Sequence, residues 1–128
     1  MKEITIIIFI ILIIFFGEIY IYKFLDTTTN SILGDLNNLK NDIQKENAEK
    51  KELQNKAERI YSKWNIINEK WSNVILHEEI DSIETSLIRA KAKIENDYLK
   101  ESIEDIETAI FLVNHIREKE KTTLKNIF

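Results

Sequence analysis

Hydrophobic residues follow two different patterns along this chain of 128 residues. From Ile4 to Tyr22 nearly every residue is apolar or aromatic, whereas the rest of the chain mixes apolar and polar residues at helical spacing. A helix of about 19 residues is roughly 28 Å long, close to the thickness of the hydrocarbon core of a bilayer. Residues 1–25 therefore predict a transmembrane signal anchor, and the lipid bilayer is the first expected partner.

The apolar segment fits an uncleaved anchor better than a cleaved signal peptide. Lys2 supplies the basic start that both classes share, but no pair of small residues two apart follows Phe16 as a cleavage site. Lys2 and Lys23 flank the segment, and the short N-terminal tail favours a cytoplasmic N-terminus with residues 26–128 outside the cytoplasm. Glu18 either reaches the interface beside two tyrosines and Lys23 or pairs with a partner helix.

Four stripes of apolar residues follow, each with spacings of three and four that place its members on one helical face. A polar break at residues 44–51 fits a turn near Asn47 or a solvated stretch of one long helix. Further turns are expected near residue 75 and at Asn96-Asp97. The stripes are Ile32, Leu36, Leu39 and Ile43; Leu53, Ala57, Ile60, Trp64, Ile67, Trp71 and Val74; Leu76, Ile80, Ile83, Leu87, Ala90 and Ile94; and Leu99, Ile103, Ile106, Ile110 and Val113.

These stripes predict an all-α protein in which the N-terminal transmembrane helix is followed by a small antiparallel bundle of three or four helices. We assign residues 26–31 to a polar collar that offers several N-caps, residues 32–118 to the bundle and residues 119–128 to a C-terminal tail. One long parallel coiled coil through the middle stripe is the alternative. Tryptophan at its core positions is bulky for a two-stranded seam, which favours the bundle.

Composition excludes several classes of function but does not identify one. The net charge of −4 argues against nucleic acid as a partner, and the absence of cysteine removes disulfides and thiolate metal sites. Proline is absent, and Gly34 is the one glycine after the apolar segment, so sheets and phosphate-binding loops are not expected. Heavy use of Ile, Lys, Asn and Glu suggests an AT-rich bacterial genome. We expect no enzyme activity and no cofactor.

One cluster has the residue types of a metal or acid–base site. His77 and Asp81 stand four residues apart on one helical face, and a hairpin at Asn96-Asp97 would set His77 opposite Ile116, beside His115. These side chains are candidate metal ligands. However, His115 points away from the apolar face of its helix. The simpler interpretation is therefore a salt bridge from His77 to Asp81 that fixes a helix start.

Aromatic and terminal apolar residues are candidates for protein contacts. Trp64 and Trp71 lie one heptad apart on the same face, where they either fill the core or serve as an exposed anchor for a partner. Leu124, Ile127 and Phe128 end the chain, where they either dock on the bundle or form a recognition peptide. All five are interaction candidates.

The chain resembles the domain of unknown function 4363 family. The resemblance rests on the apolar N-terminal segment, the paired tryptophans, the stretch His77–Asp81 and the final Leu124–Phe128. It implies a small single-span protein of low-GC Gram-positive bacteria, with neighbouring multi-span membrane proteins, and it implies no known activity. Family members commonly have proline where this chain has Arg117, which leaves open how sharply the last helix ends.

Together these features predict a non-catalytic accessory or interaction subunit of a bacterial membrane complex. Its partner would be another integral membrane protein or a second copy of the chain. Two alternatives stay open at this point: an extracytoplasmic bundle that senses a ligand or metal, and a self-associating structural coiled coil.

Overall fold

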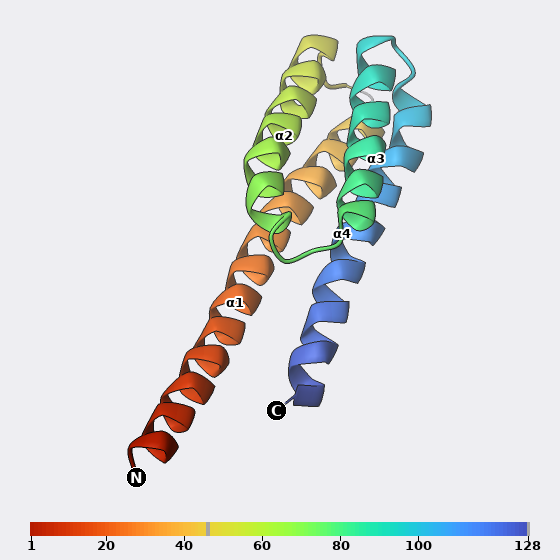
Figure 1. Cartoon of the computed structure of the whole chain (residues 1–128). Helices are drawn as coiled ribbons and strands as arrows, with labels where there is room; N and C mark the ends of the chain where they lie inside the picture. The colour runs from red at the N-terminus through yellow and green to blue at the C-terminus, as the bar shows by residue number, and fades with distance from the viewer. Residues whose placement is uncertain (46, 128) are drawn as a thin grey trace.

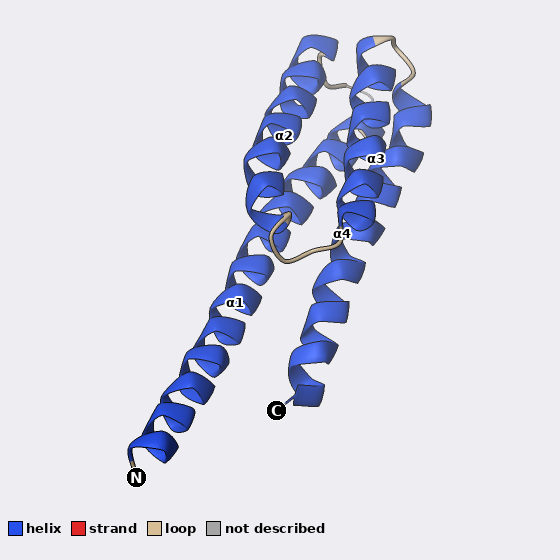
Figure 2. Cartoon of the chain, in the orientation of Figure 1, coloured by secondary structure: helices blue, strands red, loops and turns tan. Residues whose placement is uncertain are grey.

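The computed structural model describes residues 1–45 and 47–127, and these residues form helices and short connections without any strand. The all-α prediction is confirmed (Figure 2). In chain order the helices are α1 (Lys2–Gln44), α2 (Lys50–Trp71), α3 (His77–Glu95) and α4 (Leu99–Ile127) (Figure 1).

The helices form an up-down-up-down bundle. Helix α1 packs against α2 and α4, and α3 packs against the same two helices, so each helix has two neighbours. The chain reverses after Gln44, after Trp71 and after Glu95, as the polar break and the predicted turns indicated. The structure is therefore a compact antiparallel bundle and not a long parallel coiled coil.

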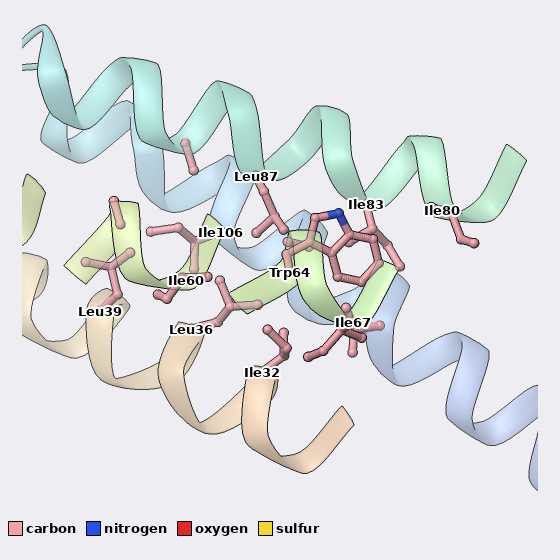
Figure 3. Packing of buried hydrophobic residues seen from close by; sticks show 14 of the residues in the cluster. Ile32, Leu36, Leu39, Ile60, Trp64, Ile67, Ile80, Ile83, Leu87 and Ile106 are labelled. Atoms are coloured by element: carbon pink, nitrogen blue, oxygen red, sulfur yellow. The ribbon is translucent and has the colours of Figure 1, made fainter. Parts of the chain in front are cut away.

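The four apolar stripes meet in one core. Trp64 and Trp71 are fully buried, with ring centroids 5.6 Å apart and planes at 81°. Figure 3 shows Trp64 surrounded by aliphatic side chains from α1, α2 and α3. Edge-to-face contact between two buried indoles adds to the large apolar area that each removes from water. The stripe residues thus pack where their spacing predicted. The two exceptions are Val74 and Leu76, which are exposed at the α2–α3 connection.

Helix α1 passes without a break from the apolar segment into the bundle. The N-caps expected at residues 26–31 are not used, because α1 continues through them from Lys2 to Gln44. The side chains of two of these residues bond across the bundle instead. The Trp71 indole donates to Thr28 Oγ1 at 2.9 Å, and Arg117 donates to Asn30 Oδ1 at 2.6 Å. The polar collar is therefore a belt of interhelical contacts in the middle of α1.

Helix α4 likewise continues through the segment assigned to a tail. Residues 119–127 are helical, so the expected boundary at residue 118 is absent. Arg117 keeps its backbone N–H and extends its guanidinium to both Asn30 and Asn114, at 2.6 Å each. A proline at this position would remove a helix hydrogen bond, whereas arginine lets the helix proceed.

The α3–α4 turn shows how a chain poor in glycine reverses. Asp97 adopts a left-handed conformation with φ of 68°, which aspartate tolerates better than most residues. The N–H of Tyr98 bonds the carbonyl of Lys93 at 2.8 Å, and the N–H of Asp97 bonds that of Ile94 at 3.4 Å. This is the Schellman pattern that ends helices, formed here with aspartate at the usual glycine position.

Ion pairs reinforce the order of the helices. Between α1 and α2, Lys56 pairs with Asp42 and Lys63 pairs with Asp35. Hydrogen bonding to the Lys56 ammonium lowers the pKa of Asp42, and the same bond raises the pKa of Lys56. These groups are only half-buried and remain in contact with solvent, so the pairs fix the register of the two helices more than they add to stability.

Two further pairs join α3 to α4, with N–O distances of 2.6 Å each. Lys93 contacts Asp105, which is only 8% exposed, and Lys119 contacts Glu79. A buried carboxylate is costly without a partner, so the Lys93 ammonium makes the burial of Asp105 tolerable. The two contacts define how α3 and α4 are aligned along their lengths.

Candidate functional site

The first part of α1 is the largest apolar surface that the bundle leaves uncovered. Its large apolar side chains from Ile4 to Ile14 are between 46% and 64% exposed, and no other helix packs on them. Among the described residues, α1 is the one helix long and apolar enough to cross a membrane. An N-terminal signal sequence meets the same criteria of length and composition.

The apolar surface ends where the bundle begins. Tyr20 is 73% exposed and Glu18 is half-buried, while Leu25 is already in the core. Figure 1 shows the N-terminal half of α1 projecting beyond the α2–α3 connection, with the end of α4 on the same side. The junction between exposed apolar surface and packed core therefore lies within a single helix, between about residues 18 and 25.

Glu120 on α4 is an acidic group close to this junction. Burial raises the pKa of Glu120, the Lys119 ammonium lowers it, and the carboxylates of Glu79 and Glu18 raise it further. The net shift is upward from the ordinary value of 4.5. Because the pKa in the folded state exceeds the unfolded value, ionised Glu120 opposes folding at neutral pH.

We therefore expect Glu120→Gln to raise the melting temperature slightly at pH 7. The gain should shrink as the pH falls through the raised pKa, and it should vanish at a pH well below 4.5, where Glu120 is protonated in both states. Thermal unfolding of the full-length protein in detergent across this pH range measures the effect. Glu104→Gln, at an exposed position on the same helix, is the control. An equal gain for both variants at every pH would contradict the prediction.

The two tryptophans belong to the core and not to an exposed anchor. Both indoles are 0% exposed. The structure therefore supports core packing. The prediction that Trp64 and Trp71 are exposed interaction residues is wrong, because neither side chain reaches the surface. Their spacing on the apolar face of α2 already favoured burial over exposure.

The three candidate metal ligands do not come together. His77 is the first residue of α3, as predicted for a helix start, but His77 and Asp81 are both exposed and form no ion pair with each other. His115 lies on the outer face of α4 and stacks on Phe111, with ring centroids 5.9 Å apart. Among the residues that the structure describes, no three His, Asp or Glu side chains are grouped to hold a metal ion.

The predicted alignment of the α3–α4 hairpin is also corrected. The sequence placed His77 opposite Ile116, next to His115. In the structure Lys119 contacts Glu79, so the residues that face His77 lie further along α4 than Ile116. Ile116 is buried, whereas His115 is exposed. His77 and His115 therefore lie at different heights along the α3–α4 hairpin, and their side chains do not point towards each other.

The C-terminal interaction candidates lie largely outside the described residues. Leu124 and Ile127 belong to helix α4, but their side chains are not described, and Phe128 is outside the described range. Whether these apolar residues dock on the bundle or form a recognition peptide stays a prediction.

Sequence reasoning misplaced two exposed apolar residues of the bundle. Val74 and Leu76 were assigned to the apolar faces of two helices, yet both are exposed, and Ile75 between them is buried. The signal was present, because a turn was expected near residue 75 and a stripe cannot continue through a turn. Both residues belong to the α2–α3 connection, which is at the end of the bundle from which the N-terminal part of α1 projects (Figure 1).

The fold and the exposed apolar surface define a four-helix protein with an N-terminal helix suited to a membrane. The chain belongs to the family described as Domain of unknown function (DUF4363), which matches residues 19–127. The match covers the part of α1 that enters the bundle, all of α2 and α3, and α4 to its end. Searches of curated proteins and of solved structures found no match.

Proposed function

We propose that this chain is an uncleaved single-pass membrane protein and a non-catalytic accessory subunit of a bacterial membrane complex. The observation that carries the proposal is the continuity of α1, whose exposed apolar segment leads without a break into the packed core. Such a helix cannot leave the membrane or turn within it without moving the bundle. The chain is thus suited to couple a membrane partner to a domain at the membrane surface.

The positions of the polar side chains support a non-catalytic role. The residue types best suited to chemistry, at His77, Asp81 and His115, are exposed and separate. The polar groups near the core bond across helices instead, as in the Lys93 contact with Asp105. These groups hold the bundle together, and a bundle held in this way offers a stable surface to a partner.

We propose further that the N-terminus is cytoplasmic and that the bundle lies outside the cytoplasm. A reporter enzyme fused after Phe128, active only outside the cytoplasm, should be active in intact cells. The same fusion lacking residues 4–22 should be inactive. Activity of a reporter that works only inside the cytoplasm would reverse the orientation.

The accessory role is tested by purification of the tagged full-length protein from native membranes in mild detergent. We expect a multi-span membrane protein to co-purify in a fixed ratio to the bait. Glu18→Gln and Glu3→Gln form a matched pair, because each removes one carboxylate at one end of the apolar segment. Loss of the partner with Glu18→Gln alone would locate the contact at that end. Recovery of the bait alone, as a monomer or an oligomer, would refute the role.

A further inference from the structure

A groove of about 540 Å³ lies between the C-terminal part of α1 and the first part of α2. Its described lining includes four cationic side chains but only two carboxylates, although the whole chain has a net charge of −4. Figure 1 shows both parts at the end of the bundle remote from the N-terminus of α1. The groove is therefore a positive feature of an acidic protein, and a ligand reaches it from solution.

Two ion pairs cross the groove and fix the register of its walls. Lys63 Nζ lies 2.7 Å from Asp35 Oδ2, and the Lys56 ammonium contacts Asp42. A step of seven residues along α2 thus corresponds to a step of seven residues in the opposite direction along α1. The positions of α2 midway between the two pairs therefore face the positions of α1 midway between the same pairs.

The midway positions hold an arginine but no carboxylate. On α2 they are Arg59 and Ile60, and on α1 they are Asn38 and Leu39. Ile60 and Leu39 are buried in the core. Arg59 and Asn38 are exposed and line the groove. On either side of them, a cation of α2 faces a carboxylate of α1, whereas the cation at the middle position faces a neutral amide.

The Arg59 guanidinium has no carboxylate partner on its other side either. It also borders a neighbouring groove, where two of the carboxylates have other partners. Glu58 lies 2.9 Å from Lys91 Nζ, and Glu52 lies 3.5 Å from Lys56 Nζ. Among the residues that the structure describes, no ion pair involves Arg59. Its charge is therefore available to a ligand.

The free donors of the groove suit an oxyanion. Arg59 presents a planar fork of N–H groups that binds a phosphate or a carboxylate through two parallel hydrogen bonds. Lys45, which also forms no ion pair within the described part of the chain, lines the same groove, as do the amides of Asn38 and Asn41. A phosphate group carries about −1.5 to −2 charges at pH 7, which two unpaired cations balance. A single carboxylate would leave one cation unbalanced.

We propose that this groove binds the phosphate group of a small soluble molecule, with Arg59 as the main contact. The inference goes beyond the accessory role, because it concerns the end of the bundle remote from the apolar segment. The volume of about 540 Å³ is in the range of sites for small organic molecules, so the phosphate is one part of a larger ligand. The two flanking ion pairs hold the walls of the groove in place.

Isothermal titration calorimetry with inorganic phosphate tests the site on the full-length protein in detergent. At physiological ionic strength, where distant charges are screened, we expect saturable binding at millimolar phosphate. Arg59→Gln should weaken that binding by at least about tenfold, because it removes a charge-assisted contact. Arg89→Gln removes the same charge from an exposed position on α3. This control should change the affinity by less than about twofold.

Asn38→Asp tests the missing carboxylate directly. The new carboxylate should pair with Arg59 and weaken phosphate binding by at least about tenfold, without lowering the melting temperature. Asn37→Asp adds the same charge at an exposed position of α1 that does not line the groove. This matched variant should change the affinity by less than about twofold.

The outcomes that would overturn the inference are distinct. Absence of saturable binding would exclude a phosphate site, and equal weakening by Arg59→Gln and Arg89→Gln would mean a general effect of charge. Phosphatidylglycerol added to the detergent should leave the phosphate affinity unchanged. A fall as large as the loss in Arg59→Gln would assign the groove to a lipid headgroup instead of a soluble molecule. None of these results bears on co-purification of a membrane partner, so the two proposals can fail separately.

Discussion

Trp64→Ala should lower the free energy of unfolding of the bundle by about 3–5 kcal/mol, the usual cost of truncating a fully buried aromatic side chain. Trp64 is 0% exposed and packs edge to face on Trp71, so its removal leaves a cavity beside a second indole. Urea unfolding of the full-length protein in detergent, followed by far-ultraviolet circular dichroism, measures the loss. Phe111→Ala at an exposed position should change stability by no more than about 0.5 kcal/mol.

A matched pair of phenylalanine variants separates packing from hydrogen bonding. The Trp71 indole donates to Thr28, which in turn donates to the carbonyl of Phe24 at 2.8 Å, whereas Trp64 Nε1 has no hydrogen-bond partner among the described residues. Trp71→Phe should therefore cost about 0.5–1.5 kcal/mol more than Trp64→Phe. Equal costs would mean that the bond to Thr28 contributes nothing measurable. A loss below about 1 kcal/mol for Trp64→Ala would contradict central packing altogether.

Periodicity predicted the core well because each stripe repeats over several turns of helix. The stripe through Leu53 and Trp71 needs only the 3.6-residue period to place its members on one face, and all of its members up to Trp71 are buried. The same rule failed at Val74 and Leu76, because the period has no meaning once the helix ends. Helix ends depend on backbone hydrogen bonds, which apolar spacing does not report.

Polar residues also led to a wrong prediction, that of a helix start at residues 26–31. Thr28 and Asn30 are good N-caps in isolation, which suggested a helix start, yet both lie inside α1. The Thr28 hydroxyl donates a hydrogen bond to the carbonyl of Phe24 and accepts one from the Trp71 indole. Trp71 is 43 residues away in the sequence. The alignment of His77 against α4 failed for a related reason, since it depends on which side chains pair across the hairpin. Such long-range partners are not visible in a local pattern.

A break in helix α1 between its apolar segment and the bundle should be the most informative change. Thr27→Pro should destabilise the protein by about 3 kcal/mol, because proline removes one backbone hydrogen bond and clashes with the carbonyl four residues earlier. Thr27 is exposed, so no core contact is lost with its side chain. Thr27→Ala keeps the helix and should be nearly neutral. The same urea titration in detergent compares the two variants.

The proline variant also tests whether the apolar segment of α1 and the bundle move as one body. Spin labels at Ile11→Cys and Phe111→Cys, one in the apolar segment and one on α4, should give a narrow distance distribution in the otherwise unchanged protein. Thr27→Pro should broaden that distribution, because a kink lets the two parts reorient independently. If the distribution stays narrow, contacts of Arg117 with Asn30 and of Trp71 with Thr28 hold the junction without the helix. If it is broad in both proteins, α1 bends at the junction already, and a rigid coupling between the apolar segment and the bundle is refuted.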